Sequence, residues 1–230
     1  MLRLYEARVA AGARLVTAAG WADTLALSAL GIDCHWLPTA LPDAEFHPVE
    51  RRRLPLEGPG DGPGSGKVAG FLGNFDFWPN TDALNTLLRH WLPALRAVAW
   101  QLIVAGQGSE RLLNLPDDVL RLGPVVDVDD YYAHIDVTLA PIRLGGGMKV
   151  KVVESWARGI AMLGTTVAFE GFSPEFANLF VQVPAAGLTA ATLARFDALA
   201  PIDPGSAQLQ AFGQSRLRAS VHQLLSEANF

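Results

Sequence analysis

Five short apolar runs, separated by helical segments, constrain the fold of this 230-residue chain more than any other feature. Each run has the length of a single strand, and the segment 81–96 between the first two runs has apolar residues at helical spacing. Strands that are apolar throughout and alternate with helices are typical of a parallel sheet covered on both faces. The runs are residues 68–72, 101–105, 119–122, 137–140 and 161–164.

This alternation predicts an α/β domain with a Rossmann-like parallel sheet between about Lys67 and Pro184. Sheets of this kind bind ligands at the carboxyl ends of their strands. Gly73 and Gly106 directly follow two predicted strands, and a run of three glycines, 145–147, lies shortly after a third. We therefore expect these glycines at the ligand-binding edge of the sheet.

The chain divides into four parts at its compositional breaks. Residues 1–53 alternate helix and strand, residues 54–66 are mostly glycine and proline and are typical of a linker, and residues 67–200 hold the predicted sheet. Residues 201–230 form a tail in which apolar spacing predicts one long helix over 206–227. Further predicted elements are helices over 2–11, 21–30, 129–134 and 149–158 and strands over 15–17 and 34–37.

Charge and cysteine content exclude several classes of protein. The net charge is −5 and no basic run is long, so a nucleic-acid partner is not expected. Cys34 is the single cysteine, which rules out a disulfide framework and fits a reducing cytoplasm. Glu6 and Arg8 interrupt any signal peptide, and no apolar run reaches the roughly 20 residues of a membrane span. The five histidines are scattered, and neither a metal site nor a bound cofactor is expected.

The most informative stretch is the three-glycine loop with the predicted helix that follows it. Glycines allow backbone N–H groups to approach an anion closely, and a helix N-terminus adds partial positive charge. Two of the chain's three lysines, Lys149 and Lys151, lie in the first turn of this helix, and Arg143 precedes the loop. Cations there oppose the helix dipole unless a bound anion compensates them. This pattern favours a diphosphate site, with Glu154 placed to accept hydrogen bonds from ribose; a glycine turn with Glu154 paired to Lys151 or Arg158 is the simpler alternative.

Other motifs do not carry a function. The run 62–67 resembles a P-loop, but position 61 is aspartate instead of glycine, and Val68 replaces the required serine or threonine. Asp127, Asp129 and Asp130 stand close together like metal ligands, yet their position before a short helix is more simply explained by capping.

Residues 68–172 resemble the C-terminal domain of retaining glycosyltransferases of family 4, which have the GT-B fold. Five segments occur in the family's order and resemble its "PN-x-D-A" helix start, its "IVG-x-G" strand, its base-binding segment, its "GGG-x-R-x-K-x-x-E" donor loop and its "T-x-x-x-x-EG" segment. They are residues 73–83, 102–108, 122–136, 140–159 and 165–171.

The resemblance implies a glycosyltransferase-like protein that binds a nucleotide-diphosphate sugar, UDP- or GDP-linked, and transfers a hexose to a glycan or lipid-linked acceptor. The glycines 145–147 and Lys151 would hold the diphosphate, Glu154 the ribose, and the donor site would also include Gly73, Asn74, Gly106, Arg143 and Lys149. The resemblance does not identify a catalytic residue in this chain. The family commonly has a second glutamate eight positions before Glu154, where this chain has Gly146.

The first part of the chain resembles only the end of the family's N-terminal acceptor domain. Residues 1–53 are therefore interpreted as a remnant of that domain, and the tail is expected to pack back onto it, with Trp21, Leu25 and Trp36 as contacts. A homo-oligomer or a separate acceptor-domain chain is the expected partner, and the location is the cytoplasm or the inner face of the membrane. Two alternatives stay open, namely a non-catalytic nucleotide-sugar-binding or scaffold protein with this fold, and an unrelated Rossmann-like cofactor binder, which the missing GxGxxG motif disfavours.

Overall fold

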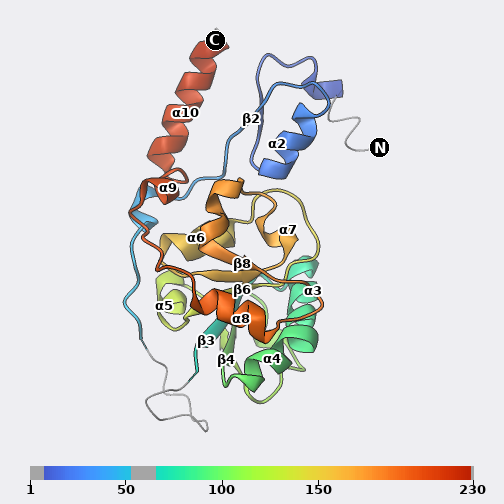
Figure 1. Ribbon diagram of the computed structural model, residues 1–230, viewed down its shortest axis with the longest axis vertical. Coiled ribbons are helices and arrows are strands. Elements are labelled where there is room, and N and C mark those ends of the chain that lie inside the picture. The colour runs from blue at the N-terminus through green and yellow to red at the C-terminus, as the bar shows by residue number, and fades with distance from the viewer. Residues whose placement is uncertain (1–7, 53–65, 229–230) are drawn as a thin grey trace.

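The computed structural model describes residues 8–52 and 66–228. A six-stranded sheet, parallel throughout, lies at its centre in the order β5-β4-β3-β6-β7-β8 (Figure 1). The strands are β3 Val68–Leu72, β4 Gln101–Ala105, β5 Val119–Gly123, β6 Val137–Ala140, β7 Met162–Gly164 and β8 Phe180–Gln182.

The predicted parallel sheet and its five predicted strands are confirmed. The sixth strand, β8, was not predicted from the sequence. It pairs with β7 at the sheet edge, where Met162 lies opposite Phe180. It directly follows a 3-10 turn that ends at Leu179, so no glycine or proline marks where the strand begins.

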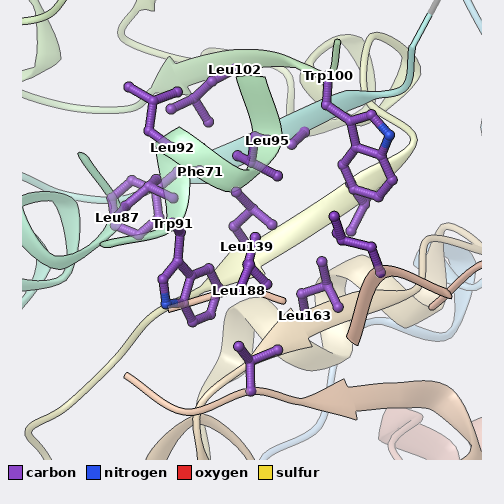
Figure 2. Close-up of a cluster of buried hydrophobic side chains, with 14 of the residues drawn as sticks. Phe71, Leu87, Trp91, Leu92, Leu95, Trp100, Leu102, Leu139, Leu163 and Leu188 are labelled. Carbon is purple, nitrogen blue, oxygen red and sulfur yellow. The ribbon is translucent and has the colours of Figure 1, made fainter. Parts of the chain in front are cut away.

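Helices cover both faces of the sheet, which explains why its strands are apolar throughout. One face packs against α3 Trp78–Thr86, the π-helical turn η2 Leu87–Trp91, α4 Leu92–Ala97 and α8 Ala190–Asp197. Figure 2 shows Leu87, Trp91 and Leu95 lying over side chains of the strands in this cluster. The other face packs against α5 Val128–Ala133, α6 Val150–Ala157 and α7 Thr166–Phe169. Short 3-10 turns lie at η1 Asp43–Glu45, η3 Ser109–Arg111 and η4 Pro174–Leu179.

The helix predicted over 81–96 begins earlier and is not continuous. α3 starts at Trp78, and a π-helical turn separates it from α4. Pro93 has no backbone N–H to donate one turn back, so a regular α-helical pattern cannot continue through it.

The N-terminal segment forms a small unit of its own. β1 Val16–Ala18 pairs in parallel with β2 Cys34–Trp36, and α2 Trp21–Ser28 connects them. These three elements match the predicted strands and helix. Only residues 8–11 of the helix predicted over 2–11 are described; residues 8–10 are helical and residue 11 is in a turn. The proposed linker lies almost wholly outside the described residues.

The tail is not the single helix that its apolar spacing predicted. It forms α9 Ala207–Gln210 and α10 Gln214–Glu227, with Gly213 extended between them. The interruption has a clear cause, because Leu41 donates to the Phe212 carbonyl at 2.9 Å and accepts from the Gln214 N–H at 3.0 Å. A helix through Gly213 would use the same backbone groups internally, so the strand-like bridge and the helix exclude each other.

The tail does return to the N-terminal segment, through Phe212, Ser215 and, at the end of α10, the carbonyl of Ala228, which accepts from Arg14 at 3.0 Å. The ring of Trp36 meets that of Phe212 edge-on at 6.1 Å, and Trp21 meets Trp36 at 5.6 Å. The Asp43 carboxylate accepts from the Ser215 N–H and hydroxyl and so caps α10 from a distant part of the chain. Leu25, the third expected contact, is 52% exposed. α10 itself has no buried residue and extends beside the segment that holds β2 (Figure 1).

Candidate functional site

The strand order places a crevice at one edge of the sheet. The chain runs from β3 toward β5 on one side and from β6 toward β8 on the other, so β3 and β6 flank the point where the direction reverses. Loops that leave neighbouring strands in opposite directions open a crevice there, and ligands of such sheets bind in it. A cleft of about 680 Å³ lies at this place, lined by residues that follow β3, β4, β5 and β6.

Two glycines form the base of this cleft by close backbone approach. Gly106 has a φ of +115°, and a Cβ there would overlap the carbonyl oxygen of Gly73. Phe75 donates its backbone N–H to the Gln107 carbonyl at 2.8 Å, which joins the loops after β3 and β4. Both Gly73 and Gly106 line the cleft, as their positions at the ends of predicted strands indicated.

Lys151 lines the cleft from the first turn of α6. Its ammonium donates to the Leu72 carbonyl at 2.9 Å and to Oδ1 of Asn80 at 3.1 Å. Asn80 is itself held by the Asn74 carbonyl, which accepts from its amide nitrogen at 2.8 Å. A lysine ammonium has three N–H groups, so one has no hydrogen-bond partner within the described part of the chain. Burial lowers the pKa of Lys151 to about 8, against the opposing effect of Glu154.

Glu154 lines the same cleft one turn further along α6. Burial raises the pKa of its carboxyl group, and the nearby Arg158 and Lys151 act in the opposite direction. Arg158 donates to the backbone carbonyl of Glu154 rather than to its side chain, and bonds Asp129 and Glu45 with its other nitrogens. The simpler alternative of a Glu154 ion pair is therefore not what the structure contains, and no described residue donates to the Glu154 carboxylate.

Lys149 occupies the N-cap position of α6 and turns back onto the glycine loop. Its ammonium donates to the carbonyls of all three glycines 145–147, at 2.9–3.1 Å, and lies 3.7 Å from Glu170. Burial lowers the pKa of Lys149, and Glu170 acts against that effect. The hydrogen bonds of the Lys149 ammonium are thus made to the glycine loop.

Residues 66–194, more than half of the chain, match the sequence profile of the glycosyl transferases group 1 family. The chain belongs to this family. The resemblance stated from its motifs is therefore confirmed, as is the Rossmann-like fold of the GT-B C-terminal domain. A search of curated proteins finds no matching relative.

Several solved structures share the fold of this member of the glycosyl transferases group 1 family, at low sequence identity. HepE of Anabaena, solved in complex with UDP, superimposes with a TM-score of 0.66 and 15% identity over 97% of this chain and 68% of its own. Sucrose-phosphate synthase of Thermosynechococcus elongatus gives 0.68 and 19%, over 98% and 61%. The GtfA/B complex gives 0.65 and 16%, over 97% and 47%. The chain thus spans only part of the length of these proteins.

Two of the predicted site residues in this family member lie away from the cleft. Arg143 makes a two-point ion pair with Asp82 on α3, and it is not among the lining residues. Gly147 borders a small recess of about 80 Å³ instead, together with Ala22 and Asp23 of α2. The structure brings together the other predicted residues at the cleft, namely Gly73, Asn74, Gly106, Gly145, Gly146, Lys149, Lys151 and Glu154.

Sequence reasoning missed residues that complete the cleft of this family member. Asn80 belongs to the "PN-x-D-A" motif, and its position there was the signal that could have identified it as the partner of Lys151. The other missed residues lie within the segments that resemble the family's motifs, such as Val125 and Val128 in the base-binding segment 122–136, but the resemblance singled out none of them individually. These missed residues include Phe77, Pro79, Gln107, Val125, Val128, Ile142, Leu144, Met148 and Val150.

Of the aspartates near the start of α5, only Asp127 caps the helix with its side chain, whereas Asp129 and Asp130 lie in the first turn and pair with Arg158 and Arg52. The Asp127 side chain accepts from the Asp129 N–H at 2.9 Å and caps the helix. Among the residues described, no group of three or more histidine, cysteine or acidic side chains is arranged to hold a metal ion. No helix in the described ranges is long and apolar enough to cross a membrane.

Proposed function

We propose that this chain binds a nucleoside diphosphate sugar, UDP- or GDP-linked, in the cleft between β3 and β6. It transfers the sugar, alone or with a partner, to a glycan or lipid-linked acceptor. The observation that carries the proposal is the ammonium of Lys151, which lines the cleft beside the glycine loop and, among the described residues, has hydrogen-bond acceptors for only two of its three N–H groups. The structures of HepE with UDP and with UDP-glucose support a UDP-linked donor.

The cleft offers complementary groups along its length. Lys151 and the glycine loop supply N–H donors for the phosphates, and charged hydrogen bonds of this type are the strong ones. The unpaired Glu154 carboxylate accepts from the ribose hydroxyls. Val125 and Val128 provide an apolar wall for the base.

Replacing Lys151 by alanine is expected to weaken UDP binding by about 1.5–3 kcal/mol, the range for a charged hydrogen bond. Replacing Glu154 by glutamine is expected to cost less, because one carbonyl acceptor remains, and to reduce the preference for UDP over its 2′-deoxy analogue. Calorimetric titration with UDP, its 2′-deoxy analogue, GDP and ADP measures both effects and identifies the base.

Lys67→Ala is the matched control, since Lys67 pairs with Asp197 at 2.6 Å and does not line the cleft. Its affinity for UDP is expected to equal that of the wild type. Equal affinities of the wild type and Lys151→Ala would refute the assignment of the phosphate site.

The affinity for UDP is expected to fall as the pH rises through about 8. The pKa of Lys151 in the free protein is about 8, so below this value the lysine already carries the charge that the diphosphate requires. Above it, binding has to restore a proton, which costs up to tenfold in affinity per pH unit. Titrations between pH 7 and 9.5 should show the decline and proton uptake, and Lys151→Ala should lose most of both. A wild-type affinity that stays constant to pH 9.5 would contradict the role of this ammonium.

A non-catalytic nucleotide-sugar-binding or scaffold protein is the second candidate. The open position at Gly146, where relatives commonly have a glutamate, favours it. Tight nucleotide binding without any turnover in the presence of a partner chain would support this alternative.

The proposal includes a second copy or a separate acceptor-domain chain, in the cytoplasm or at the inner face of the membrane. Support comes from apolar side chains of the N-terminal segment and α10 that the described residues leave exposed. Leu25 is 52% exposed, Leu30 is 51% exposed and Leu225 is 37% exposed.

A further inference from the structure

The contacts of Lys149 use its whole hydrogen-bonding capacity. An ammonium group has three N–H bonds, and the carbonyls of Gly145, Gly146 and Gly147 accept at 3.0, 3.1 and 2.9 Å. Only 13% of the side chain is exposed. Lys149 therefore cannot donate to a phosphate without giving up a loop carbonyl, whereas Lys151 has a donor to spare.

The geometry of the peptide bond determines where the N–H groups of the loop point. In a trans peptide the C=O of one residue and the N–H of the next point in opposite directions, and the described residues contain no cis peptide bond. Because three successive carbonyls point to the Lys149 ammonium, the N–H groups of Gly146, Gly147 and Met148 point away from it. Within the described residues none of these N–H groups has a hydrogen-bond acceptor.

The exposed part of the loop has little else to hold it in this conformation. A Cβ added at any of the glycines 145–147 would meet nothing within 4 Å. The end of the loop is packed, because a Cβ at Gly171 would lie 2.5 Å from the Cα of Met148, and one at Gly20 would lie 3.1 Å from the Cα of Gly147. Gly145 and Gly147 have φ values of +108° and +70°, which leave them in conformations that other residues rarely adopt. The part at Gly145 and Gly146, which has no such packing, is conformationally free unless a specific contact orders it.

We propose that Lys149 is a positioning residue, which gathers the three loop carbonyls and thereby directs the N–H groups of Gly146 and Met148, the two of these residues that line the cleft, toward the donor's phosphates. It does so without contacting the phosphates itself. This inference rests on the proposed function for the identity of the anion, but its account of the loop applies to the ligand-free protein as well. Gly146 and Met148 line the cleft, which places these donors where the diphosphate would lie.

Glu170 completes the arrangement from the other side. Its carboxylate lies 3.7 Å from the Lys149 ammonium. It balances the positive charge of this ammonium, which the neutral loop carbonyls alone would not do. The start of α2 fixes this segment, since Trp21 donates to the Gly171 carbonyl at 2.9 Å and Ala22 to the Glu170 carbonyl at 3.0 Å. The N-terminal segment therefore supports the loop through Glu170.

Lys149→Met removes the ammonium while keeping an unbranched side chain, and Lys67→Met is the matched control. Without ligand, backbone 15N relaxation should show the order parameters of Gly145 and Gly146 falling below about 0.6 in Lys149→Met alone. The affinity of this variant for UDP should fall at least tenfold, with the affinity for uridine unchanged, because uridine has no phosphate to meet the loop.

The chain has only three lysines, so 13C-labelled lysine gives three well-separated side-chain signals. Saturation of the wild type with UDP should shift the signal of Lys151 and leave that of Lys149 nearly in place. A shift of Lys149 as large as that of Lys151 would make it a direct phosphate ligand and overturn the inference. Unchanged loop order in Lys149→Met would overturn it too, whether or not UDP binds. If the wild type binds no nucleoside diphosphate, the proposed function fails, and the relaxation measurement still decides the role of Lys149.

Discussion

The 230-residue chain is expected to bind a nucleotide sugar and yet to transfer the sugar very slowly when it acts alone. Glycosyl transfer requires the acceptor hydroxyl to be held against the anomeric carbon while water is excluded. Leu72 is the first of the described residues that line the cleft, and the N-terminal segment contributes only Ala22 and Asp23, to the small neighbouring recess. In the described part of the chain, the N-terminal segment therefore places no residue in the cleft proposed for the donor.

The expected loss is large because positioning supplies much of the rate of such a reaction. Holding two reactants in a productive geometry is worth about 7–11 kcal/mol of the barrier. The glycine loop and Lys151 can still stabilise the departing diphosphate. Stabilising a leaving group without a placed acceptor gives slow hydrolysis of the donor at best.

Incubation of the pure chain with radiolabelled nucleotide sugars and a lysate of candidate acceptors tests this expectation. Lys151→Ala, incubated in parallel, shows how much of any hydrolysis depends on the cleft. Rapid transfer that needs an acceptor and no second protein would contradict the prediction. It would mean that the N-terminal segment, or a second copy of the chain, provides the acceptor side.

Trp156→Ala is expected to destabilise the fold by about 3–5 kcal/mol, the range for removing a buried tryptophan. Trp156 is fully buried on α6, and its ring lies 4.9 Å from that of Phe172 and 6.0 Å from that of Phe176. Its Nε1 donates to no described group, so the loss is one of packing and cavity formation. Because the same helix carries Lys151 and Glu154, weakened packing should also lower the affinity for UDP.

Urea unfolding followed by circular dichroism measures this loss, and Trp78→Ala is the matched control. Trp78 begins α3 with its side chain 62% exposed, so its removal should change the free energy of unfolding by no more than about 0.5 kcal/mol. Similar midpoints for the two variants would show that the aromatic cluster around Trp156 contributes little to stability.

The order of strands and helices in the sheet domain could be predicted from the sequence. A sheet that is buried on both faces requires apolar strands and helices that cover them. The same holds for the glycines at the strand ends, where backbone close to backbone leaves no room for a side chain, as Gly106 against Gly73 shows. The break in the tail could not be predicted. It depends on Leu41, whose hydrogen bonds to residues 212 and 214 join parts of the chain that are distant in sequence.

The candidate site divides in the same way. Local spacing alone put Lys149, Lys151 and Glu154 at the start of one helix after a glycine loop, and so determined that this stretch is suited to an anion. Only the tertiary structure decided how the two lysines differ, since Lys151 reaches Leu72 and Asn80 across the sheet edge while Lys149 folds back onto the loop. It also drew Arg143 away to Asp82. A sequence specifies which charges lie near each other along the chain, but the partner that a long side chain finally reaches depends on what the fold brings within hydrogen-bonding distance.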